Sequence, residues 1–176
     1  MLHNTTTQYG SITKNFHWIM SITIISLIAA GFIMVNMDKS TLKYSLYDTH
    51  KIGGLFVLAL IGPRLVWRFY TTTPNLNFVP KWEKFSARMG QWLLYLMMFI
   101  MPLSGWVMST AAGYIPSLFG QEIAFPIEKN EHIANLAKQI HEISAWVLTT
   151  LLILHIIAAI KSHWIDKNHI LKRMLP

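Results

Sequence analysis

Four apolar runs, each long enough to cross a lipid bilayer, limit this chain more than any other feature of its sequence. They cover about 16–35, 46–67, 89–111 and 136–161. A membrane-spanning helix needs roughly 20 mainly apolar residues, because the hydrocarbon core of a bilayer is about 30 Å thick. The runs therefore predict an all-α, integral membrane four-helix bundle that forms a single domain over residues 1–176.

The composition agrees with insertion into a membrane. Hydrophobic residues make up 53% of the chain and charged residues only 13%, and the mean hydropathy is +0.38. The formal net charge of +7 does not predict a nucleic-acid partner, because the Lys and Arg residues of membrane proteins gather in cytoplasmic loops. The chain has no cysteine, which excludes disulfides, cysteine-bound iron–sulfur clusters and thioether-linked haem.

The distribution of Lys and Arg also predicts the orientation in the membrane. Ten of these 15 residues lie in 1–17, 64–88 and 161–176, and five lie in the two remaining loops. Four spans place both termini on the same side of the bilayer, and the side with more positive charge is the cytoplasmic one. We therefore expect both termini to be cytoplasmic.

Between the apolar runs the sequence predicts shorter polar segments. Residues 1–13 are polar and are expected to form a loose tail. Asp48 or Thr49 is the expected cap of the second helix. Residues 81–85 are expected to form a short interfacial helix, and 112–135 a long loop.

Four of the eight histidines fall in or at the predicted spans: His17, His50, His141 and His155. His141 and His155 are separated by fourteen residues, almost four turns and about 21 Å of helix, so they lie on one stripe. The predicted topology places His17 level with His155 near the inner side, and His50 level with His141 near the outer side. An ionisable side chain at such a depth suggests function with a partner. The structural alternative is a neutral imidazole that bonds to a neighbouring helix.

A pair of imidazoles on facing helices suits a haem iron better than other metals. Zinc takes three or four protein ligands, and di-iron bundles use Glu-x-x-His motifs, which these spans lack. Without cysteine a haem must be held non-covalently, as in b-type cytochromes. The sequence thus predicts two haem b groups with axial pairs His17/His155 and His50/His141, and bis-histidine iron favours electron transfer over oxygen binding.

Small and basic residues add candidates for cofactor binding. Gly53 and Gly54 follow His50 by three and four positions on the same helix face, where they would leave room for a porphyrin. Ordinary helix packing explains such glycines equally well. Arg64 is a candidate partner of a haem propionate, with membrane anchoring as the alternative. The same holds for Arg68, Lys51 and Lys138.

One further histidine has a predicted role. His163 lies just past the inner end of the fourth run and is the best candidate for a proton donor at a quinone site.

Several stretches of the chain resemble the bacterial cytochrome b561 family. They are Asn15-Phe16-His17-Trp18, His50-Lys51-Ile52-Gly53, Arg64-Leu65-Val66-Trp67-Arg68, Met101-Pro102-Leu103-Ser104-Gly105-Trp106-Val107-Met108, His141-Glu142, His155 and the ending Leu171-Lys172-Arg173-Met174-Leu175-Pro176. The similarity covers nearly the whole chain. It implies a bacterial inner-membrane protein with two haem b groups, held by the same four histidines in the same pairs. It also implies quinone-linked electron transfer, with ubiquinone reduced and superoxide as one donor.

Residues and resemblance together predict a one-electron carrier that links an outer donor to the membrane quinone pool. If superoxide is the donor, the protein is an oxidoreductase of the superoxide:ubiquinone type, and Lys51 would attract the anion. One alternative is a membrane anchor subunit that passes electrons for a partner dehydrogenase. Another is a haem-free helical membrane protein, such as a small transporter.

Overall fold

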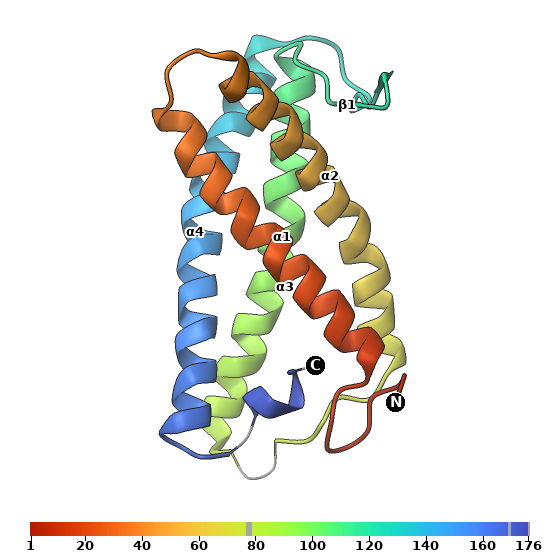
Figure 1. The fold of residues 1–176 in the computed structure, drawn as a ribbon, viewed down its shortest axis with the longest axis vertical. Coiled ribbons are helices and arrows are strands. Elements are labelled where there is room, and N and C mark those ends of the chain that lie inside the picture. Colours follow the sequence, from red (N-terminus) through yellow and green to blue (C-terminus); the bar gives the residue numbers. More distant parts are fainter. Residues whose placement is uncertain (77–78, 169, 176) are drawn as a thin grey trace.

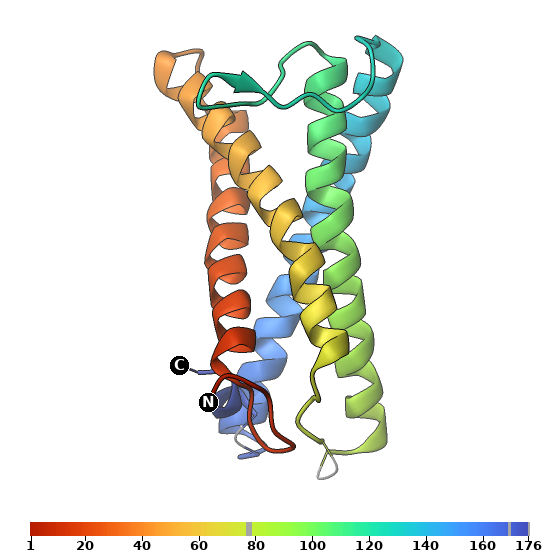
Figure 2. The same cartoon turned by 90° about the vertical axis from the view of Figure 1, so that its right-hand side faces the viewer.

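Four long helices form the body of the molecule (Figure 1). The computed structural model describes residues 1–76, 79–168 and 170–175. Both chain ends lie at the same end of the bundle in two perpendicular views (Figures 1 and 2). The elements are α1 (Ser11–Asn36), α2 (Thr41–Tyr70), α3 (Lys81–Ala111), β1 (Ser117–Leu118), β2 (Gln121–Glu122), α4 (Glu131–Trp164) and the short 3₁₀ helix η1 (Leu171–Arg173).

Each of the four long helices is long and apolar enough to cross a membrane. Only 11–22% of their most apolar stretches is buried inside the protein. Large apolar side chains therefore cover the outside of the bundle, among them Ile22, Val35 and Val66, which are 64%, 75% and 69% exposed. Such a surface is stable only against lipid. The predicted all-α, four-helix membrane bundle is confirmed.

The helices extend beyond the predicted spans. Ser40, rather than Asp48 or Thr49, caps α2, because its hydroxyl accepts a hydrogen bond from the Lys43 N–H at 3.2 Å. Residues 81–85 are the first turn of α3 rather than a separate interfacial helix. Hydropathy marks only the part of a helix that lies in lipid, whereas polar capping residues set its true ends.

The loop between α3 and α4 is shorter than predicted, because α4 begins at Glu131. Asn130 caps α4, accepting a hydrogen bond from the Ile133 N–H at 3.1 Å. The loop also contains the antiparallel hairpin of β1 and β2. Phe119 and Gly120 form its two-residue turn with φ of 53° and 79°, the conformation of a type I′ turn.

An apolar cluster fills the middle of the bundle. Its buried members come from all four helices: Met20, Ile24, Val57, Ile61, Met98 and Leu148. Leu148 lies seven residues from His141 and seven from His155. The cluster therefore separates an inner region of the bundle from an outer one.

The N-terminal segment, residues 1–10, is not the loose tail that we expected. The Asn4 side chain accepts hydrogen bonds from the Gly10 N–H at 2.8 Å and the Thr13 hydroxyl at 2.7 Å. It also donates to the Thr71 hydroxyl at 3.1 Å and to the backbone carbonyl of Thr72 at 2.9 Å. One asparagine thus joins the start of the chain to the end of α2. No pattern in the sequence predicts this long-range contact.

Candidate functional site

The structure brings the four span histidines together in two pairs. The ring centroids of His17 on α1 and His155 on α4 are 6.3 Å apart, and those of His50 on α2 and His141 on α4 are 6.4 Å apart. These are the pairs that helix depth indicated. Their role as ligands of haem iron remains a prediction.

Both pairs have a spacing that suits one metal ion between the rings. Imidazole nitrogens bind metals at about 2.0–2.1 Å, so rings on opposite sides of one ion have centroids roughly 6 Å apart. Among the described residues, no group of three or more His, Cys, Asp or Glu could hold a metal ion. The remaining ligands would therefore belong to a bound group, such as the four nitrogens of a porphyrin. The residues present fit haem.

Hydrogen bonding at the outer pair leaves a nitrogen free for a metal. Nδ1 of His141 lies 2.8 Å from the backbone carbonyl oxygen of Met101. A carbonyl oxygen can only accept, so Nδ1 carries the proton and Nε2 keeps its lone pair. Within the described residues, Nδ1 of His50 is buried and makes no hydrogen bond. The tautomer of His141 therefore suits a metal ligand, whereas no hydrogen bond fixes the tautomer of His50.

Two glycines make room beside the outer histidines. A Cβ on Gly105 of α3 would lie 2.9 Å from Cε1 and 3.1 Å from Nδ1 of His141. A Cβ on Gly31 of α1 would lie 3.5 Å from Cε1 of His50. Gly105 is therefore the glycine on which the ring of His141 depends. The sequence motif contained this residue but did not show which side chain it faces.

The predicted glycines Gly53 and Gly54 have different surroundings. A Cβ on Gly53 would lie 2.8 Å from Cδ2 of Leu27, so this glycine permits the close approach of α1 and α2. Gly54 lines a small cavity with His50 and Pro102. Their contribution to cofactor binding remains a prediction.

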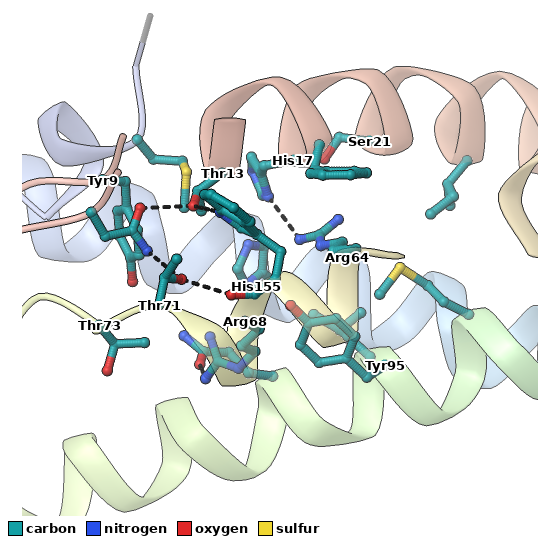
Figure 3. Close-up of a pocket in the computed structure, with 18 of the residues that line it drawn as sticks. Tyr9, Thr13, His17, Ser21, Arg64, Arg68, Thr71, Thr73, Tyr95 and His155 are labelled. Atoms are coloured by element: carbon teal, nitrogen blue, oxygen red, sulfur yellow. Dashed lines mark hydrogen bonds between the residues drawn. The ribbon is translucent and has the colours of Figure 1, made fainter. Parts of the chain in front are cut away.

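The inner pair lines a cavity that is larger than the one beside His50 (Figure 3). The empty space measures about 990 Å³, including its open mouth, and His17, His155, Arg64 and Arg68 all line it. Nη2 of Arg64 is 3.3 Å from Nδ1 of His17. The guanidinium of Arg64 also lies over the ring of Tyr95, 5.4 Å from its centroid.

Arg68 is held firmly at the same cavity, one turn further along α2. Its Nη2 donates a hydrogen bond to Oε1 of Gln91 at 3.0 Å. Its guanidinium lies 5.7 Å from the ring centroids of both Trp92 and Tyr95. These cation–π contacts and the hydrogen bond fix the charged group without neutralising it.

Neither arginine has an acidic partner in the described part of the chain. The ion pairs found there join Lys51 to Asp48, Lys138 to Glu142, and Lys161 to both Glu83 and Asp166. Two guanidinium groups in a cavity with no carboxylate among its described lining residues favour a ligand that is anionic or accepts hydrogen bonds. Haem propionates and quinone oxygens both meet this description.

The other predicted residues lie outside the two pairs. Nζ of Lys51 is 2.7 Å from Oδ1 of Asp48, and its side chain is 19% exposed. Lys138, 61% exposed, pairs with Glu142 at 3.7 Å on the surface. His163 lies near the end of α4 with a buried Nδ1 that makes no hydrogen bond to any described residue, and it is not among the described residues that line the inner cavity.

Several residues that line the inner cavity were not predicted as site residues. Tyr9 comes from the N-terminal segment, Thr71 and Thr73 follow α2, and Gln91 lies on α3. Met174, near the C-terminus, also lines the cavity. Its backbone carbonyl accepts a 2.8 Å hydrogen bond from Nε1 of Trp18, which holds it in place.

The chain is similar to known proteins over nearly its whole length. Residues 8–176 match the family described as prokaryotic cytochrome b561. The chain is 32% identical to cytochrome b561 homolog 2 of Escherichia coli (strain K12) over 175 residues, covering 98% of this chain and 93% of that protein. It is 29% identical to cytochrome b561 homolog 1 of the same organism over 162 residues, covering 91% and 92%. It is 24% identical to the probable superoxide oxidase CybB of Yersinia pestis over 172 residues, covering 96% of each.

Proposed function

Because this chain belongs to the prokaryotic cytochrome b561 family, a group of membrane electron-transfer proteins, we propose that it carries electrons through two haem b groups. Its four spans and its family place it in the bacterial inner membrane as a multi-pass protein.

The observation that carries the proposal is the presence of two histidine pairs at the spacing of a bis-histidine metal site. His17 and His155 would hold the inner haem, and His50 and His141 the outer haem. Haem supplies reversible one-electron chemistry at its iron, and the protein supplies ligands, burial and orientation. Arg64, beside His17, would pair with a propionate of the inner haem.

The apolar cluster around Leu148 has a role in this arrangement. It separates the two histidine pairs, which are about 21 Å apart along α4. Its side chains offer no hydrogen-bonding groups to a chain of water molecules or to an ion. Electrons would therefore cross the centre of the bundle without an accompanying leak of protons.

We assign the inner pair to the cytoplasmic side, because the end of the bundle that holds both termini carries ten of the fifteen basic residues. An outer donor would reduce the outer haem, and the inner haem would pass electrons to a quinone such as ubiquinone. The name of the Yersinia pestis relative suggests superoxide as donor. Two superoxide ions would each give one electron and leave as O₂, while one quinone takes two electrons and two protons to become quinol.

The experiment that tests this proposal combines a haem count with a turnover assay. A pyridine haemochrome spectrum of the purified protein is expected to show haem b at two per chain. Mixing with superoxide is expected to reduce both haems, and added ubiquinone-1 is expected to reoxidise them. Protein without haem would refute the proposal. Haems that respond to a partner dehydrogenase but not to superoxide would instead favour the membrane-subunit alternative.

Exchanging Lys51 for Glu is expected to slow reduction of the outer haem by superoxide about three- to tenfold at low salt, because the change reverses a charge next to His50. The difference should shrink as ionic strength rises, since salt screens exposed charges. Stopped-flow absorbance measures the rate. Lys39→Glu, an equal change at an exposed residue of the same end, is the control. Equal rates for the Lys51 variant and the unaltered protein would refute the idea that Lys51 attracts superoxide to the outer haem.

A further inference from the structure

The N-terminal segment forms part of the inner cavity. Tyr9 lines this cavity together with Arg68, Thr71 and Thr73 (Figure 3). The hydrogen bonds of Asn4 hold the segment against the start of α1 and the end of α2 on either side of Tyr9. Tyr9 is therefore positioned by a network of its own and not by the membrane-spanning helices alone.

The phenol of Tyr9 has an unused hydrogen-bond donor. Tyr9 is partly buried, and within the described residues its hydroxyl makes no hydrogen bond. Burial raises the pKa of Tyr9 above its ordinary value of 10.0, against the opposing effect of Arg68. The phenol thus keeps its proton at neutral pH and remains able to donate.

Arg68 complements this donor. Gln91, Trp92 and Tyr95 fix its guanidinium before any ligand arrives, and no carboxylate of the described chain pairs with it. Arg64 lies deeper, in contact with His17, and is assigned to the haem. Arg64 therefore lies beside His17. Arg68 lines the same cavity as the Tyr9 phenol and is free to bind a second group there.

We propose that Tyr9 and Arg68 bind the head group of the quinone, each donating a hydrogen bond to a quinone oxygen. This inference rests on the proposed function, because it requires a quinone to reach the inner haem. Quinone oxygens only accept hydrogen bonds, and negative charge grows on them as electrons arrive. Donors that are fixed beforehand stabilise that charge without reorganisation. The aromatic rings of Tyr95 and Trp67 line the same cavity.

The test uses the full-length, haem-loaded protein with Tyr9 changed to Phe, which removes the hydroxyl and keeps the ring. The apparent Kd and KM for ubiquinone-1 are expected to rise about tenfold, because one hydrogen bond to a substrate oxygen that gains charge is lost. Haem content, the haem spectrum and the rate of outer-haem reduction are expected to stay unchanged. Tyr70→Phe is the matched control, because Tyr70 lies at the same end of the bundle with a side chain that is 77% exposed.

The possible failures are distinguishable. If the unaltered protein reduces ubiquinone-1 and Tyr9→Phe does so with the same Kd and KM, this inference is overturned and the proposed function stands. If Tyr9→Phe instead loses the inner haem or changes its spectrum, Tyr9 serves a haem propionate and the quinone assignment is wrong. If the unaltered haem-loaded protein neither binds nor reduces ubiquinone-1, the proposed function itself fails.

Discussion

The variants His17→Ala and His155→Ala are each expected to lose one haem per chain, and both are expected to lose the same haem. The two ring centroids are 6.3 Å apart in the structure, so removal of either ring would leave the proposed inner haem iron with a single protein ligand. The outer pair is far away on the other side of the apolar cluster and should keep its haem. A pyridine haemochrome count is expected to fall from two per chain to one.

The double variant His17→Ala/His155→Ala tests the same pairing more stringently. Residues that hold one group act as a unit, so their effects do not add, and the double variant should still keep one haem. His132→Ala, which removes an exposed histidine at the start of α4, is the control and should keep both haems. Loss of two haems in the double variant, or of different haems in the two single variants, would contradict the inner pairing.

Changing Gly105 to Ala is expected to remove or distort the outer haem while sparing the inner one. The new methyl carbon would lie 2.9 Å from Cε1 of His141, a distance that real Cβ atoms essentially never show, and a tight 3.1 Å from Nδ1. The ring must move, although its hydrogen bond to the Met101 carbonyl resists movement. A redox titration is expected to show the loss of one component or a large shift in its midpoint potential.

Gly90→Ala provides the matched control on the same helix. A Cβ at Gly90 would meet no atom within 4 Å, so this change should keep both haems. Ala favours a helix over Gly by roughly 1 kcal/mol, and any general effect of that preference is shared by both variants. Two unchanged haems in Gly105→Ala would show that the His141 ring does not occupy its position in the structure when haem is bound.

The membrane fold was predictable from sequence because two strong signals agreed. Hydropathy identified four spans, and the 3.6-residue period of a helix placed His141 and His155 on one stripe. Counting residues from the membrane surface then placed His17 with His155 and His50 with His141, the pairs that the structure brings together. Neither step required knowledge of how any helix is rotated about its axis.

Other features of the site depend on rotation and on distant contacts, which such patterns do not encode. That Gly105 faces His141, while Gly53 faces Leu27, follows from the packing of neighbouring helices. Tyr9 reaches the inner cavity only because Asn4 bonds to Thr71, 67 positions away. The ends of α2 and α4 were missed because their caps lie outside the apolar runs.

α4 contributes one histidine to each pair. The number of residues between His141 and His155 is therefore constrained. Inserting a single residue into 142–154 would turn one histidine by about 100° relative to the other and shift it by about 1.5 Å. No adjustment of α4 as a rigid rod could then restore both positions. α1 and α2 each supply only one histidine, so length changes near their far ends do not meet this restriction. We therefore expect related chains to vary in loop length while keeping thirteen residues between these two histidines of the last long helix.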